Sequence, residues 1–205
     1  GAYGNTAGLP NCVIVASDGT LGFFFGGVCW SANTNTAFNS GSAPNERGNI
    51  IIPPVPGKAI GIAYSLAFAG NTSDVDLVLY SDPLGTPSAE KTISIDANTL
   101  GSNAGGIFGV KLFSSPYTFT ASQPLAAIVK PATANNVTLT HITMANSAHM
   151  KWLSLGTGAY AVNRSSGAFA AQNSNLDRYC IGLLVDFFDN GVGSGGGGGQ
   201  RVISG

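Results

Sequence analysis

The stretch Lys58-Ala59-Ile60-Gly61-Ile62-Ala63-Tyr64-Ser65-Leu66-Ala67-Phe68 decides the fold class of this chain. Its large apolar side chains recur at every second residue from 60 to 68, and small residues stand between them. Successive side chains of a β-strand point to opposite faces, so a period of two indicates a long strand with one buried face. The stretch therefore predicts a β-strand and not an amphipathic helix.

A second alternating run follows after turn-forming residues at 69–73. In residues 75–80, the apolar side chains of Val75, Leu77 and Leu79 face one way. Two alternating runs joined by a short turn are typical of a hairpin. We therefore expect the two strands to form an antiparallel pair.

Strand patterns continue along the rest of the chain. Further candidates, separated by turn residues at short intervals, lie at 12–16, 21–30, 49–52, 90–95, 107–113, 125–130 and 136–144. The last strong candidate, 178–188, carries one apolar face and is expected centrally in a sheet; that face consists of Tyr179, Ile181, Leu183, Val185 and Phe187. Only residues 147–155 suggest a helical turn. The pattern predicts an all-β fold, an antiparallel two-sheet β-sandwich of jelly-roll type.

Composition narrows the classes of partner. The chain has 205 residues, of which 9% are charged, against about a quarter in typical proteins, and its net charge is −1. No basic field is available to neutralise phosphates, so we expect no nucleic-acid partner. No apolar run approaches the roughly 18–20 residues of a membrane-spanning helix, so we expect no membrane insertion.

The chain divides into three expected parts. Residues 1–44 form an N-terminal β segment, expected to serve attachment or an interface, and residues 45–190 form the jelly-roll sandwich. The composition changes abruptly after Asn190, where glycine dominates. Residues 191–205 are therefore expected to be a glycine-rich tether with a short C-terminal tail.

The three cysteines, Cys12, Cys29 and Cys180, are odd in number and show no C-x-x-C spacing. This argues against a disulfide framework and against a zinc site, so buried free thiols are expected. A bond between Cys12 and Cys29 stays open if the chain resides in an oxidising compartment.

Candidate chemistry is sparse, and we expect a non-enzymatic protein without metal or cofactor. His141 and His149 have no orienting carboxylate nearby in sequence, so each is interpreted as a hydrogen-bonded structural or surface residue. Asp74, Asp76 and Asp82 offer oxygen ligands for Ca²⁺ but lack the dense spacing of a calcium loop. These carboxylates are interpreted as groups on a solvent-facing strand edge.

Aromatic residues give the only binding candidates. Trp152 and Tyr160 lie in the loop-rich region 147–167, and both residue types can stack on sugar rings while their polar edges stay wet. They are the candidate glycan platform. Core packing or a subunit interface is the competing interpretation.

The stretch Ser73-Asp74-Val75-Asp76-Leu77-Val78-Leu79-Tyr80-Ser81-Asp82-Pro83-Leu84-Gly85-Thr86 resembles the strand-and-turn signature of jelly-roll modules, which reads DfDLvLYdp.Gt. Such modules occur in accessory domains of secreted enzymes and in tailed-phage proteins. The similarity to the phage group covers roughly residues 45–199; it continues through 45–48, 95–99, 129–133, 135–139, 146–150 and 181–183 and ends in the glycine-rich tail. The first 40 residues depart from the pattern, which leaves the attachment region open.

The resemblance implies a structural protein of a tailed-bacteriophage virion, on the capsid or tail surface, without an assigned catalytic residue. Its expected roles are particle assembly, decoration or host adsorption, and its expected location is the extracellular particle. Expected partners are other virion proteins and copies of itself, with a homotrimer as one arrangement. The alternative is a carbohydrate-binding β-sandwich module of a receptor-binding protein or secreted enzyme, with a host cell-surface glycan as ligand.

Overall fold

The computed structural model describes residues 12–15, 21–25, 34–53, 55–68, 74–96, 103–143, 160–172 and 177–186. The described residues form fourteen strands and no helix. The strands make two sheets, and all their pairings are antiparallel. The prediction of an all-β, two-sheet antiparallel protein is confirmed at this level.

The first sheet has eight strands. Its main path runs β1 (Cys12–Val15), β2 (Leu21–Phe25), β14 (Ile181–Asp186), β5 (Gly57–Phe68), β10 (Val137–Thr143) and β13 (Asp177–Tyr179). Two more strands join it from the side: β3 (Thr34–Phe38) pairs with β10, and β8 (Asn103–Phe119) pairs with β5. The central place expected for the strand near the C-terminus is confirmed for β14, which lies between β2 and β5. The single strand expected over 178–188 is wrong, because the strand is interrupted at Cys180 and residues 178 and 179 belong to β13 at the end of the path.

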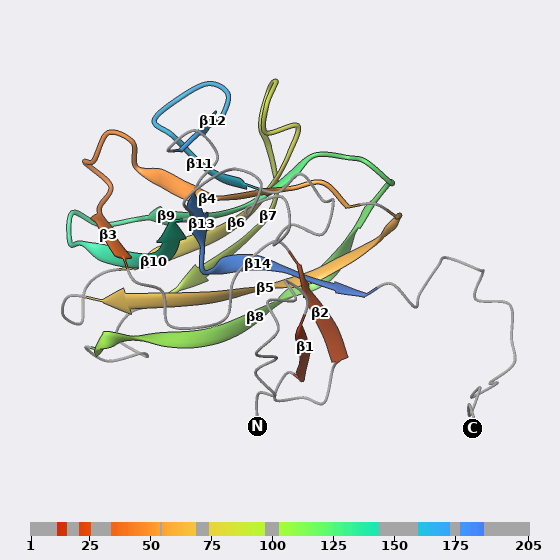
Figure 1. The fold of residues 1–205 in the computed structure, drawn as a ribbon, viewed down its shortest axis with the longest axis horizontal. Helices are drawn as coiled ribbons and strands as arrows, with labels where there is room; N and C mark the ends of the chain where they lie inside the picture. Colours follow the sequence, from red (N-terminus) through yellow and green to blue (C-terminus); the bar gives the residue numbers. More distant parts are fainter. Residues whose placement is uncertain are drawn as a thin grey trace, which may run out of the picture.

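The second sheet has six strands. Their order is β12 (Ala170–Ala171), β11 (Tyr160–Arg164), β4 (Glu46–Ile51), β9 (Leu125–Pro131), β6 (Val75–Ser81) and β7 (Ser88–Ile95). Figure 1 shows the two sheets as layers, with β4, β9 and β6 lying over β14, β5 and β8.

The core lies between the layers and takes alternate residues from both. Ile62, Tyr64 and Leu66 of β5 share one buried cluster with Leu77 and Leu79 of β6. The predicted face of Tyr179, Ile181, Leu183 and Val185 belongs to the same cluster. Each large side chain buried in this way contributes about 1.5–3 kcal/mol, so the alternating pattern accounts for the joining of the sheets.

The expected pairing of residues 58–68 with residues 75–80 is wrong. β5 belongs to the eight-stranded sheet and β6 to the six-stranded sheet, where β6 pairs with β7 and β9. Both strands have one fully apolar face, and these faces meet across the core. Either arrangement turns the apolar face of each strand toward the core, so alternation alone does not show which sheet each strand joins.

The alternation of β5 also shifts at its start. The register with β8 changes between Ala59 and Gly61, so Ala59 lies in the core cluster while Ile60 is only partly buried. This irregularity moves Ile60 off the face that the simple period of two assigned to it.

Some strands of the structure were not expected from the sequence, and some expectations concern residues outside the described ranges. The segments β3, β11 and β12 were missed in the sequence, and β11 occupies part of the region expected to be loop. The suggested helical turn at 147–155, Cys29, His149 and the tail from 191 lie outside the described residues. Cys180 is a buried free cysteine, as expected, and burial raises the pKa of its thiol to about 12.

Candidate functional site

The space between the sheets changes from apolar to polar toward one end. On several strands, the residue two positions from a core residue is polar: Leu139 is followed by His141, Ala161 by Asn163, and Tyr179 is preceded by Asp177. Because residues two apart share a face, these polar side chains point into the same interior as the core. We call this set the polar end; it comprises Thr36, Arg47, His141, Thr143, Asn163, Gln172 and Asp177.

Asn49 of β4 joins the two sheets next to the polar end. Its Nδ2 donates to the carbonyl oxygens of Tyr179 and Ile181 at 2.8 and 2.7 Å, and its Oδ1 accepts from the Tyr179 N–H at 3.0 Å. Asn49 is fully buried. These backbone groups of Tyr179 and Ile181 lie where the strand is interrupted between β13 and β14. The Asn49 side chain therefore supplies hydrogen bonds that a neighbouring strand would make along an unbroken strand.

Gln172 is the centre of the polar end. Its Oε1 accepts from the Tyr179 hydroxyl at 2.5 Å, from Asn163 Nδ2 at 3.1 Å and from Arg47 Nη1 at 3.3 Å. Its Nε2 donates to Asp177 Oδ2 at 3.2 Å, and Thr143 Oγ1 donates to the other Asp177 oxygen at 2.7 Å. Residues from both sheets thus meet in one hydrogen-bonded network.

His141 lies on the buried side of this network. Its Nδ1 lies 3.3 Å from Thr36 Oγ1, and its ring meets Tyr179 edge-on at 5.4 Å between centroids. Burial lowers the pKa of His141, the nearby Asp177 charge raises it, and Arg47 lowers it again. The expected hydrogen-bonded, structural histidine is what the structure contains.

The buried imidazole predicts a pH dependence of stability. The unfolded pKa is about 6.5 and the folded pKa is lower, so the unfolded state takes up the proton first as the pH falls. His141 should therefore weaken the fold progressively below pH ~6.5, with a slope of at most about 1.4 kcal/mol per pH unit. Urea unfolding of wild type and His141→Gln between pH 5 and 8 measures the free energy of unfolding against pH. Equal slopes in both proteins would contradict a lowered pKa of His141 in the folded state.

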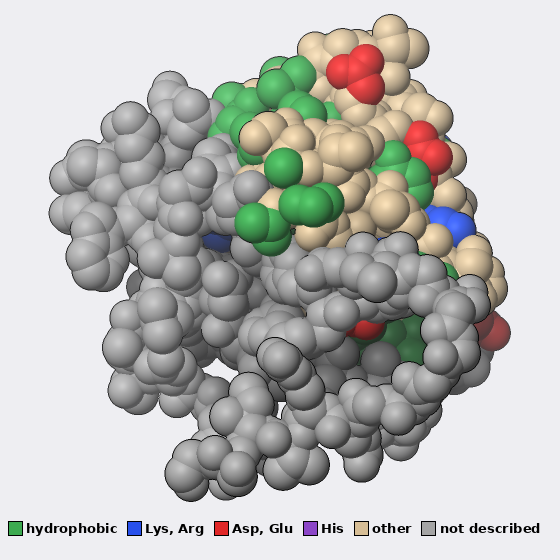
Figure 2. Space-filling view, turned by 90° about the vertical axis from the view of Figure 1, so that its right-hand side faces the viewer, with side chains coloured by type: hydrophobic (Ala, Val, Ile, Leu, Met, Phe, Trp, Pro, Cys, Tyr) green, Lys and Arg blue, Asp and Glu red, His purple; other side chains and the backbone are tan. Residues whose placement is uncertain are grey.

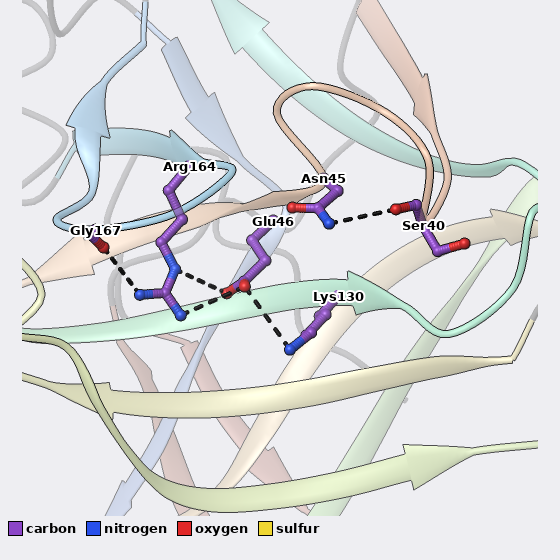
Figure 3. Close-up of polar contacts among 6 residues, drawn as sticks. All are labelled: Ser40, Asn45, Glu46, Lys130, Arg164 and Gly167. Atoms are coloured by element: carbon purple, nitrogen blue, oxygen red, sulfur yellow. Dashed lines mark hydrogen bonds and ion pairs between the residues drawn. The ribbon is translucent and has the colours of Figure 1, made fainter.

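A second cluster lies on the outer face of the six-stranded sheet (Figure 3). Arg164 donates to Glu46 through Nε at 3.0 Å and Nη2 at 3.3 Å, and to the Gly167 carbonyl at 3.0 Å. Its guanidinium lies against the rings of both Tyr80 and Phe169, at 4.5 and 4.4 Å from their centroids, and the two rings contact each other. Lys130 Nζ is 3.8 Å from Glu46 Oε1.

The cluster holds the segment after β11 across the sheet. The Phe169 N–H donates to the Pro83 carbonyl at 2.8 Å, and Phe169 completes an apolar cluster with Ile50, Val78 and Tyr80. Burial, and then the Glu46 carboxylate, raises the pKa of Tyr80 to about 12. The polar groups here satisfy one another, which indicates a structural role.

Replacing Arg164 with methionine should destabilise the protein by about 2–4 kcal/mol, because Glu46 would stay buried without its bidentate partner. Adding Glu46→Gln should restore part of the loss, since the unpaired charge is then gone. Lys130→Met removes the same charge from a side chain that is 44% exposed and should cost less than about 1 kcal/mol. Chemical denaturation of wild type and the three variants, including the double one, gives the comparison; equal losses for Arg164→Met and Lys130→Met would refute it.

Of the two aromatic binding candidates, the structure describes only Tyr160. Tyr160 begins β11, is partly buried, and packs against the outer apolar cluster beside Ile52. Burial raises the pKa of its hydroxyl. Trp152 lies outside the described residues. A glycan platform made of these two residues stays a prediction.

The aspartates of the β6 region are engaged within the chain, and the strand edge expected for them is wrong, because β6 lies between β9 and β7. Asp76 Oδ1 accepts from Ser94 Oγ at 2.5 Å, and Asp82 Oδ2 accepts from the Thr86 N–H at 2.9 Å. Within the described ranges, no group of three His, Cys, Asp or Glu side chains is arranged to hold a metal ion. A search of the same ranges finds no helix long and apolar enough to cross a membrane.

The described surface is poor in charge. Figure 2 shows one face on which neutral side chains and backbone predominate, with scattered hydrophobic groups and few charged atoms. Val55 and Leu84 are the exposed large hydrophobic residues among those described, at 48% and 47% exposure. This distribution follows from the 9% charged composition.

The fold and the polar end define the class of protein as a two-sheet antiparallel β protein with a hydrogen-bonded interior. No protein-family model and no curated protein matches the chain. The resemblance of residues 73–86 to jelly-roll modules therefore stays a prediction.

Sequence reasoning missed most of the polar end. Arg47 lies in β4, whereas Gln172 and Asp177 come from a distant part of the chain, and no short motif contains all three. One signal was present: in β4 (Glu46–Ile51), the polar Asn49 stands directly before Ile50 and Ile51, which the structure buries on opposite faces. A buried amide must be hydrogen-bonded, so this position pointed to a bond between elements.

Proposed function

We propose that the chain is a non-enzymatic structural protein of a tailed-bacteriophage virion, a jelly-roll-type sandwich on the capsid or tail surface. The observation that carries the proposal is the use of buried polar groups to hold the sheets together, above all the three bonds of Asn49. A building block of a particle must keep its shape under load, and buried hydrogen bonds between sheets serve that need.

The charge-poor surface supports assembly. A chain with so few charges remains soluble most readily when neighbouring subunits cover part of it. Copies of the chain, with a homotrimer as the expected form, and other virion proteins are the proposed partners. Residues 1–44 are proposed to supply attachment, and the glycine-rich residues 191–205 a tether.

Labelling of particles tests the proposal. An antibody raised against the purified chain should label the capsid or the tail of intact particles at regular positions in electron micrographs. Light scattering of the purified chain should give a multimer, with a trimer expected. Absence of label together with absence of the chain from dissociated particles would refute a virion role, and a monomer at micromolar concentration would refute self-assembly.

A further inference from the structure

β1 is the outermost strand on the main path of the eight-stranded sheet. Among the described strands it pairs only with β2, from Cys12 opposite Phe24 to Val15 opposite Leu21. β2 pairs in turn with β14, so no described strand bonds the other side of the β1 backbone. Such an edge presents backbone N–H and C=O groups that can pair with another strand.

The two edges of the six-stranded sheet are protected against such pairing. At one edge, β12 has only two residues. At the other edge, β7 carries Glu90 and Lys91, and it bulges there because its register with β6 skips Glu90. Short strands, charges and bulges are devices that keep sheet edges from pairing with another chain.

The other edges of the eight-stranded sheet are also less open than β1. β8 carries Lys111 and Pro116. β13 has three residues, and the Tyr179 backbone within it is bonded to Asn49. Three of the five residues of β3 are polar. β1 reads Cys-Val-Ile-Val in a regular register, so it is the one edge among the described strands without charge, proline, bulge, amide or hydroxyl side chain.

The hairpin of β1 and β2 lies at the rim of the molecule. Figure 1 shows both strands projecting beyond the two layers. β1 has its main contacts with β2, and β2 has its main contacts with β1 and β14. Another chain can therefore join the edge of β1 without disturbing the junction of the two sheets.

A second copy of the chain fits this edge. Two antiparallel strands related by a two-fold axis present the same groups to each other, so the edge of β1 is its own complement. No like charges meet, because β1 and β2 carry none. The net charge of the whole chain is −1, so two copies approach each other with little repulsion.

We propose that β1 of one copy pairs antiparallel with β1 of a second copy and joins two eight-stranded sheets into one. Paired residues point to the same face, so the two-fold axis passes at Val13 or at Ile14. A trimer has no two-fold axis, so this contact joins two trimers of the proposed assembly. The contact rests on the proposed self-assembly, but it does not need a place in a virion.

Sedimentation velocity of the full chain at about 1 to 200 µM tests the contact, which is small and therefore weak. The mass of wild type should double within this range, whatever its number of copies at the lowest concentration. Ile14→Lys and Val13→Lys should abolish the doubling, because a charge on an edge strand opposes pairing. Asn35→Lys adds the same charge at an exposed position of β3 and should leave the doubling unchanged.

Circular dichroism shows which variants are folded. A constant mass of wild type, or doubling that persists in a folded Ile14→Lys or Val13→Lys protein, would overturn the pairing. A trimer that does not double would overturn this contact and leave the proposed self-assembly standing. Absence of the chain from particles would refute the virion role and leave the doubling unaffected.

Single cysteines locate the two-fold axis. In a protein with Cys12→Ser and Cys29→Ser, either Val13→Cys or Ile14→Cys places a thiol opposite the same thiol of the second copy. Directly paired residues lie close enough for a disulfide, so one of the two variants should form linked pairs of chains under mild oxidation. Ser88→Cys, at an exposed position of β7, should form none. Failure of both β1 variants to cross-link would overturn the pairing of β1 with β1.

Discussion

Replacing Asn49 with alanine is expected to destabilise the protein by about 3–5 kcal/mol. Three hydrogen bonds are lost at once, and the Tyr179 N–H and the carbonyls of Tyr179 and Ile181 lose this partner in a fully buried place. Each buried polar group left unsatisfied costs about 1–3 kcal/mol. Total stabilities of domains are about 5–15 kcal/mol, so this single change removes a large share.

Urea denaturation followed by circular dichroism measures the effect. Asn35→Ala is the matched control, because Asn35 is exposed on β3 and its loss should change the stability by less than about 0.5 kcal/mol. A loss below about 1 kcal/mol for Asn49→Ala would show that the side chain does not hold the sheets together.

Replacing Gly48 with alanine should cost at least about 3 kcal/mol or prevent folding. A Cβ at this position would overlap the carbonyl oxygen of Ala127 and lie 2.9 Å from the Ile128 Cα. Both are backbone atoms of β9, and β4 is bonded to β11 on its other edge, so neither strand can move aside cheaply. The glycine is required by the close approach of the neighbouring backbone.

Gly41→Ala is the control for this change. A Cβ at Gly41 would make only an ordinary contact, 3.4 Å from Asn39 Oδ1. Its stability should stay within about 0.5 kcal/mol of wild type. Thermal unfolding of the two variants under one condition gives the comparison, and a Gly48→Ala protein as stable as Gly41→Ala would contradict the packing described for β4.

The strands could be predicted because the alternation of residue types within each strand shows which side chains share a face. The alternating residues of β5, β6 and β14 were sufficient to identify those strands and the side that faces the core between the sheets. They did not show that Val78, Tyr80 and Leu184, on the other side, are buried as well. The partners of these strands were not predictable in the same way: the stacking of β5 on β6 depends on which sheet each strand joins, and both arrangements bury Leu77 and Leu66 equally well. The alternation within one strand does not show which sheet that strand joins.

The polar end was beyond prediction for a related reason. Arg47 lies in β4, Gln172 directly after β12 and Asp177 in β13; β4 and β13 pair with strands that are distant in sequence. The short strands β11 and β12 lack the long alternation that identified β5. His141 was interpreted as a hydrogen-bonded structural residue, and the structure buries it beside Thr36. The nearby Asp177 carboxylate was not foreseen, because it is distant in sequence.

The proposed function rests on the closed, hydrogen-bonded junction of the two sheets. In a particle, that junction would resist separation of the layers.

Hydrogen exchange of the Tyr179 amide tests the central claim most directly. This N–H donates across the sheets to Asn49 Oδ1 at 3.0 Å, inside a residue with no exposed surface. The amide should exchange only through global unfolding, with a protection free energy equal to that from denaturation, and Asn49→Ala should abolish the protection selectively. Rapid exchange of Tyr179 in the wild-type protein, while the core strands β5 and β14 stay protected, would contradict the account.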